Sequence, residues 1–170
     1  MMQYISDSDH YNEVLKASFN AKRLLWIGTA DIKDLHVKYK SVYVPYLKVL
    51  SDALKRNVSV RLIHAKEPGQ NFRKDFDKYP GLLKNLERML CPRVHFKIII
   101  IDMKVVYIGS ANMTGAGMGA KSKDRRNIEA GIFTDDPVVV EAAINQFDEV
   151  WMGKYCKTCA RKDYCSDGIV

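Results

Sequence analysis

Hydrophobic and polar positions along the chain alternate between the period of a helix and the period of a strand. Apolar residues recur every three or four positions at residues 10–22, 44–56, 82–90 and 137–151, which predicts helices. Short runs rich in Ile, Leu and Val predict strands at residues 23–30, 58–65, 95–101, 105–112 and 131–135. Residues 67–81, charged and marked by Pro and Gly, are predicted to form a loop. This alternation predicts an α/β fold, a mixed β-sheet flanked by helices on both faces.

The first of two adjacent strands, HFKIIII at residues 95–101, has apolar residues on both faces. This predicts a strand covered on both sides, near the centre of the sheet. His95 and Lys97 share one face because side chains alternate along a strand. Asp102 has the opposite parity and lies at the strand end, so we interpret it as a turn or orienting residue rather than a reacting group.

The second strand, VVYIGSAN at residues 105–112, carries two neutral hydrogen-bonding side chains. Ser110 and Asn112 are two residues apart and are expected on one face. Gly109 would allow backbone or ligand to approach closely. The two strands together would offer a nucleophile or base, a cation and two hydrogen-bonding groups.

These residues complete the spacing H-x-K-x4-D-x6-G-S-x-N, which resembles the signature of the phospholipase D superfamily. Two other H-x-K triplets, at residues 36–38 and 64–66, lack the Asp and the G-S-x-N. The full string therefore carries the resemblance, and an ordinary buried hairpin would not account for it. Every named position is filled, by His95, Lys97, Asp102, Gly109, Ser110 and Asn112.

The resemblance implies a fold over residues 1–152 and a chemistry. A phosphohistidine would form on His95, while Lys97, Ser110 and Asn112 would neutralise charge on the phosphoryl oxygens, with no catalytic metal. Glu129, in the segment NIEAGIF, resembles the carboxylate that accepts a hydrogen bond from the catalytic His in the superfamily. The expected catalytic set is therefore His95, Lys97, Asp102, Ser110, Asn112 and Glu129.

The chain has 170 residues and a single copy of the motif, so it is expected to be one globular domain. Single-motif members, such as Nuc-type and Zucchini-type nucleases, complete the site as homodimers. The resemblance thus implies that the partner's His95 would act as acid and then as base toward water.

The charge balance bears on the substrate. A net charge of +7 and a pI near 9.2 favour a polyanionic partner, although many basic proteins only have a solvated positive face. The loop MTGAGMGAKSKDRRN is expected to clamp a nucleic-acid backbone. The cations that would do so are Lys121, Lys123, Arg125 and Arg126.

Three functions therefore remain open. A nuclease that cleaves DNA or RNA is favoured, with a phospholipase or phosphatidyl transferase as the second candidate and a catalytically idle nucleic-acid-binding module as the third. The start MMQYISDSDH does not resemble a signal peptide, and the apolar runs are too short to span a bilayer. We therefore expect a cytoplasmic protein with no stable membrane association.

The cysteines give a second signal. Cys156, Cys159 and Cys165 form C-x2-C-x5-C in a short tail, residues 153–170, and Cys91 precedes the first motif strand. Four thiols suit one tetrahedral metal centre of structural role. The tail resembles the iron–sulfur arrangement of RecB-type and CRISPR-adaptation exonucleases, which favours a 4Fe–4S cluster over zinc. Inert free thiols are the remaining alternative.

Overall fold

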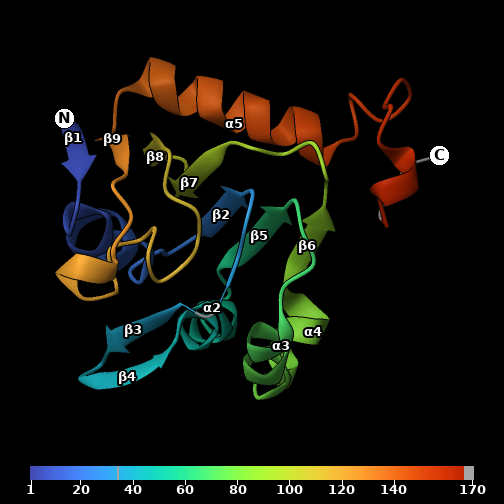
Figure 1. Ribbon diagram of the computed structural model, residues 1–170. Helices are drawn as coiled ribbons and strands as arrows, with labels where there is room; N and C mark the ends of the chain where they lie inside the picture. Colours follow the sequence, from blue (N-terminus) through green and yellow to red (C-terminus); the bar gives the residue numbers. More distant parts are fainter. Residues whose placement is uncertain (34, 167–170) are drawn as a thin grey trace.

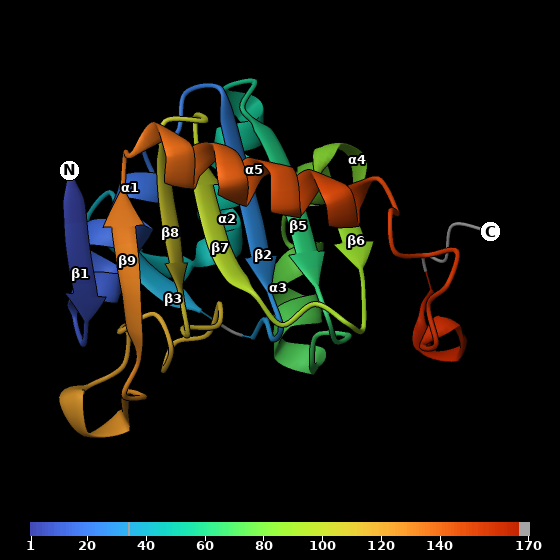
Figure 2. The same ribbon diagram turned by 90° about the horizontal axis from the view of Figure 1, so that it is seen from above.

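The computed structural model describes residues 1–33 and 35–166, and the last residues of the predicted tail, 167–170, lie outside the described residues. Its main sheet has seven strands in the order β1-β9-β8-β7-β2-β5-β6 (Figures 1 and 2). Neighbours pair in parallel between β2, β5 and β6 and antiparallel elsewhere, so the sheet is mixed. The strands are β1 (Met2–Ser6), β2 (Leu24–Thr29), β5 (Ser59–His64), β6 (Glu87–Leu90), β7 (Lys97–Ile101), β8 (Val105–Gly109) and β9 (Ala130–Thr134). A separate hairpin pairs β3 (His36–Tyr39) with β4 (Val42–Pro45).

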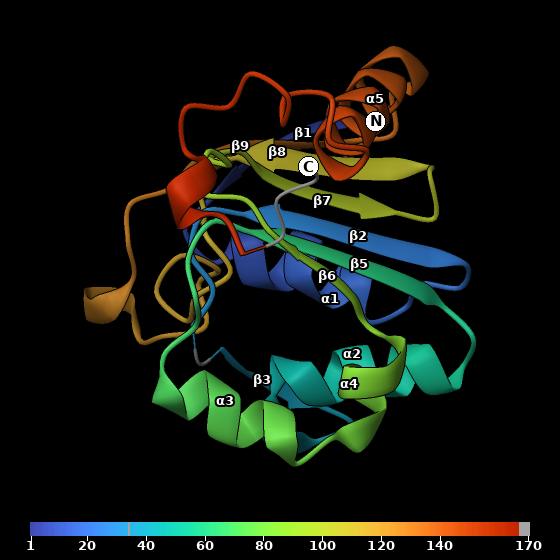
Figure 3. The same ribbon diagram turned by 90° about the vertical axis from the view of Figure 1, so that its right-hand side faces the viewer.

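Helices cover both faces of the sheet, as predicted. One face carries α5 (Pro137–Trp151), and the opposite face carries the remaining α-helices and the hairpin (Figure 3). Within the described ranges, none of the helices combines the length and the apolar character that a membrane span needs. The other helical segments are η1 (His10–Leu15), α1 (Lys16–Ser18), α2 (Tyr46–Lys55), α3 (Gln70–Asp77), α4 (Pro80–Asn85), η2 (Lys123–Arg125) and η3 (Lys162–Tyr164).

The central strand β7 contributes to two hydrophobic cores. Ile98 and Ile100 belong to the cluster on the α5 side, and Ile99 and Ile101 belong to the cluster on the opposite side. Burying one such side chain stabilises a fold by roughly 1.5–3 kcal/mol. The prediction of a strand covered on both faces is therefore confirmed, and β7 is a firm support for the polar residues at its ends.

The C-terminal end of α5 is fixed to the sheet by Arg61 of β5. Its guanidinium lies 4.7 Å from the ring centroid of Trp26 and 4.9 Å from that of Trp151. It also contacts Asp148, at 3.4 Å. These cation–π and ionic contacts define the point from which the Cys-rich tail departs.

Several predicted elements were wrong. The predicted loop at 67–81 contains α3, and the predicted helix at 82–90 is α4 followed by the edge strand β6. Phe72 is buried and stacks with Phe76 one turn later. These two residues form the apolar face of the helix, but the charged residues around them made the helical period difficult to recognise. At β6 the strand has a neighbour on one side only, and its exposed polar residues obscured the alternation.

The ends of the motif strands lie together along one side of the main sheet, the side formed by strand ends rather than by an outer strand. The pairs Gly28–Ile98, Lys97–Gly109 and Gly109–Gly131 place the ends of β2 and β8 beside the starts of β7 and β9. Figure 2 shows the loop before β9 and the C-terminal tail on either side of these strand ends. The motif residues therefore meet in loops at strand ends, and the prediction that Ser110 and Asn112 share a face of a strand was wrong because β8 ends at Gly109.

Candidate active site

Lys97 is the first residue of β7, and its ammonium group lies against His95. The lysine is buried, at 7% exposure, whereas His95 is exposed two residues before the strand. Lys97 Nζ donates a hydrogen bond to the His95 carbonyl oxygen at 2.5 Å and lies 3.2 Å from Nδ1 and 3.5 Å from Nε2 of the ring. Burial lowers the pKa of Lys97, and the nearby Glu129 carboxylate partly opposes this. A cation is thus held beside a reachable imidazole.

Asn112 is oriented by the end of β2. Its side-chain oxygen accepts hydrogen bonds from the backbone N–H of Ala30 at 3.2 Å and of Asp31 at 3.1 Å, and from the Thr29 hydroxyl at 3.2 Å. Two backbone donors fix which end of the amide is oxygen. The amide nitrogen is therefore the group that Asn112 offers to a ligand.

Ser110 and Glu129 form one hydrogen-bonded unit. The Ser110 hydroxyl donates to Glu129 Oε2 at 2.5 Å and accepts from the Ala130 N–H at 3.0 Å. The other carboxylate oxygen accepts from the Asn127 amide at 3.0 Å. The expected hydrogen bond from His95 to Glu129 is not among the contacts of the described residues, and the carboxylate is instead bonded to Ser110 and Asn127.

Tyr107 explains the motif glycine. A Cβ at Gly109 would overlap the Tyr107 hydroxyl, and one at Gly131 would overlap its ring. Tyr107 is fully buried, which raises its pKa to about 12, and its hydroxyl accepts from the Ala111 N–H at 3.3 Å. The close approach that Gly109 permits is thus made by a neighbouring side chain.

Beneath the site lies a histidine that the sequence analysis missed. The His10 ring meets Tyr107 edge-on, with centroids 5.6 Å apart. Its Nε2 is buried without a hydrogen-bond partner among the described residues, and burial lowers its pKa. A neutral His10 is therefore part of the packing below the reacting groups. Thr29 and Tyr107 were also missed, although Tyr107 shares its strand face with Gly109.

Asp102 lies at the other end of β7, away from Lys97. Its carboxylate accepts from the backbone N–H groups of Lys22 at 3.1 Å, Arg23 at 2.7 Å and Leu24 at 3.0 Å. Burial would raise the pKa of Asp102, but these donors outweigh burial and the pKa lies below its ordinary value. This geometry fits the interpretation as a turn residue, and the structure does not bring Asp102 together with the other motif side chains.

The predicted basic clamp is divided in the structure. Lys121, Lys123 and Arg125 are exposed, and the last two lie in η2. Arg126 instead forms an ion pair with Asp7 at 2.9 Å and donates to the Lys121 carbonyl oxygen at 2.7 Å. Arg126 therefore fastens the loop, and three cations remain for a ligand.

The predicted metal ligands line one cavity of about 510 Å³ beside the strand ends that carry the motif residues. All four cysteines are free thiols of intermediate exposure. Across the described part of the chain, no three His, Cys, Asp or Glu side chains stand close enough together to hold a metal ion. The lining of this cavity includes Cys91, His95, Phe96, Cys156, Cys159 and Cys165.

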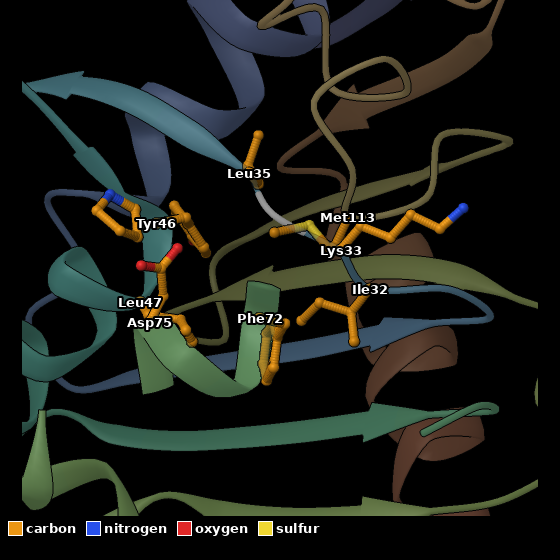
Figure 4. A pocket seen from close by; sticks show the side chains of 9 residues that line it. Ile32, Lys33, Leu35, Tyr46, Leu47, Phe72, Asp75 and Met113 are labelled. Atoms are coloured by element: carbon orange, nitrogen blue, oxygen red, sulfur yellow. The ribbon is translucent and has the colours of Figure 1, made fainter. Parts of the chain in front are cut away.

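A second, much smaller cavity lies between α2, α3 and the loop after β8 (Figure 4). Its wall is mostly apolar and includes Ile32, Phe72 and Met113, beside Asp75. Its volume of about 10 Å³ has room for no more than one water molecule. It is a gap in packing rather than a ligand site.

Comparison with known proteins agrees with this geometry. The family model described as "Cardiolipin synthase, PLD-like domain" matches residues 4–151. No curated protein matches the sequence. NucT from Helicobacter pylori superposes with a TM-score of 0.66 at 18% identity, over 89% of this chain and 96% of that chain.

Two further solved structures share the fold. Nuc from Salmonella typhimurium, described as a phospholipase D family member, has a TM-score of 0.63 at 18% identity, over 89% of this chain and 94% of that chain. Phosphatidylserine synthase from Haemophilus influenzae Rd KW20 has a TM-score of 0.60 at 14% identity, over 91% of this chain and 38% of that chain. At these identities the likeness establishes the fold, and the fold predicted from the motif is confirmed.

Proposed function

The chain belongs to the PLD-like family of the phospholipase D superfamily, and on that premise we propose that it is a metal-independent phosphodiesterase that cleaves nucleic acid. The observation that carries the proposal is the placement of the Lys97 ammonium beside both ring nitrogens of the exposed His95. A nucleophile for phosphorus and a cation for the phosphoryl oxygens are thereby held in one place.

The proposed reaction has two displacements at phosphorus. A ring nitrogen of His95 forms the N–P bond while the bond from phosphorus to the leaving oxygen breaks, and an acid gives that oxygen a proton. Water then attacks phosphorus, losing a proton to the same group acting as base, and the N–P bond breaks. Lys97 and the Asn112 amide nitrogen stabilise the negative charge that builds on the phosphoryl oxygens in both steps.

Among the described residues, no second histidine of the chain stands beside His95 to serve as the acid. The sequence has four histidines, of which His10 and His64 are fully buried. His36 lies on the β3–β4 hairpin, 3.8 Å from Asp75. We therefore infer a two-fold homodimer in which the partner's His95 is the acid and then the base.

A partly exposed apolar row offers a surface on which a second copy would pack. The pairs Ile98–Ile108, Ile108–Ile132 and Ile132–Tyr4 form one row across the α5 face of the sheet, and Ile98 at one end of the row is buried. Tyr4 is 66% exposed and Ile108 is 38% exposed. An uncovered row of this kind is typical of an interface.

Two observations favour nucleic acid as the substrate. The chain covers nearly the full length of Nuc and NucT but only 38% of the phosphatidylserine synthase. The exposed cations Lys121, Lys123 and Arg125 lie in the loop before β9, beside the strand ends that carry the motif residues, and suit a phosphate backbone. Phosphatidyl transfer is the second candidate, because the matching family model is described as a cardiolipin synthase.

The test is hydrolysis of labelled single- and double-stranded DNA and RNA, beside a short-chain phospholipid, all with chelator present. We expect cleavage of an oligonucleotide that His95→Ala abolishes. His36→Ala removes the histidine of an H-x-K triplet outside the motif and should keep full activity. Cleavage of the phospholipid alone would overturn the choice of substrate, and full activity of His95→Ala would overturn the mechanism.

A further inference from the structure

The C-terminal tail, residues 153–166, lacks a hydrophobic core of its own. From residue 152 to residue 166 no side chain is buried, and Tyr155 and Tyr164 are exposed. Apart from Gly153, the residues that are partly shielded from solvent are Cys156, Cys159 and Cys165. A segment in which no side chain is buried has no apolar core to hold it, and small units of this kind usually depend on a cross-link or a metal.

The sheet supplies a fourth thiol to the same place. Cys91 follows β6, where its backbone N–H donates to the His64 carbonyl oxygen at 2.9 Å and its own carbonyl accepts from Val94 at 3.0 Å. The Cys165 thiol contacts the Leu90 carbonyl oxygen at 3.6 Å, so the tail returns to the residue before Cys91. Figures 1 and 2 both show the tail beyond the end of α5, on the β6 side of the sheet.

The cavity between Cys91 and the tail is lined by positive charge, which suits a centre of thiolates. All four cysteines line its volume of about 510 Å³, together with Arg93 and Lys162. No described Asp or Glu is among the lining residues. Four thiolates around a metal carry net negative charge, and two cations without a carboxylate complement it.

We propose that Cys91, Cys156, Cys159 and Cys165 bind one metal centre, a 4Fe–4S cluster, that ties the tail to the sheet beside the active site. Thiolates are the preferred ligands of iron–sulfur clusters and of zinc. The thiols do not yet meet, and the tail must close around the metal; no buried side chain of the described tail opposes that movement.

Among the described residues, no three of the thiols stand close enough together to hold one ion, and we take this as favouring the cluster over zinc. Zinc requires all four sulfur atoms at about 2.3 Å from one ion. In a 4Fe–4S cluster each thiolate binds a different iron atom, so the ligands stand farther apart and a larger cavity is filled. His95 lines the same cavity, so the proposed centre would lie directly beside the phosphodiester site, and its proposed role is to hold the tail in place.

The experiment is metal analysis of the full chain purified without oxygen. We expect iron and acid-labile sulfide in about four equivalents each per chain, with broad visible absorbance. Zinc in one equivalent without iron would overturn the cluster and leave a four-thiolate zinc site. Neither metal, with all four thiols freely titratable in the folded protein, would overturn the proposal.

Variants assign the ligands without an activity assay. Cys156→Ser, Cys159→Ser, Cys165→Ser and Cys91→Ser should each lose most of the metal and lower the Tm. Gln146→Ala removes a cavity-lining side chain that has no thiol and should keep the metal. If a Ser variant does not fold, reconstitution of the metal-stripped wild-type protein with iron and sulfide still tests whether the chain binds the cluster. Full metal content in every Ser variant would contradict the assignment.

Discussion

At the scale of single residues, the candidate site depends on polar side chains that hold one another at strand ends. His95, Lys97, Ser110 and Asn112 were found from sequence because one motif of short spacing contains them. Thr29 was missed because it lies on a distant segment and acts through a hydrogen bond to Asn112 at 3.2 Å. Such partners depend on tertiary contacts that strand periodicity does not encode.

The two ends of the Asn112 amide have separable tasks. In Asn112→Asp, a carboxylate oxygen can still accept from Ala30 and Asp31, but the donor is replaced by a negative charge that repels phosphate. We expect cleavage to fall by roughly 100-fold or more, the usual effect of losing a donor to the transition state. The Tm should change little, and in Asn112→Ala both activity and Tm should fall. Equal cleavage by Asn112→Asp and wild type would exclude the donor role.

Asp102 provides a prediction about stability alone. Asp102→Asn should lower the free energy of unfolding by about 1–2 kcal/mol at neutral pH, because a charged acceptor of three backbone N–H groups is lost. The folded-state pKa of Asp102 is lowered, so its stabilisation is present above the unfolded value of about 3.9 and is lost as pH falls through the folded pKa. Urea unfolding of both proteins from pH 7 downward measures the difference. A gap that persists undiminished well below pH 3 would contradict this origin.

At the scale of elements, the strands and helices with clear periodicity were predicted and the edges were not. β7 and α5 were recognisable because their apolar patterns are long and regular. β1 and β6 lie at the two edges of the sheet, where each strand pairs with one neighbour only. Both strands carry exposed side chains, polar or apolar, that obscure the pattern of a strand. Their register is decided by pairing partners distant in sequence.

The loop before β9 carries a prediction about binding. Replacing Lys121, Lys123 and Arg125 by Gln should weaken nucleic-acid binding across sequences and reduce its salt dependence, because phosphate contacts release counterions. Replacing three exposed lysines on helices α2, α3 and α4, Lys55, Lys74 and Lys84, removes the same charge and is the control. Fluorescence anisotropy over a salt series measures both slopes. Identical slopes for the two triple variants would mean that this loop has no special contact with the backbone.

At the scale of the whole molecule, the account requires two copies. Since each active centre would need both His95 rings, mixed dimers of wild type and His95→Ala should be inactive. Activity should then fall with the square of the wild-type fraction after the subunits exchange. Cleavage assays over a mixing series measure the curve, with sedimentation at the same concentration to give the oligomeric state. A linear decrease, or an active monomer, would refute the shared site.

The most direct test of the central claim is the capture of the covalent intermediate. The wild-type chain is mixed with an oligonucleotide labelled at the scissile phosphate, quenched within the first turnover and digested for mass spectrometry. We predict a phosphoryl adduct on His95 that is stable in base and labile in acid, and that is absent from His95→Ala but present in His36→Ala. Cleavage that proceeds with no adduct on His95, or with the adduct on another residue, would contradict the account.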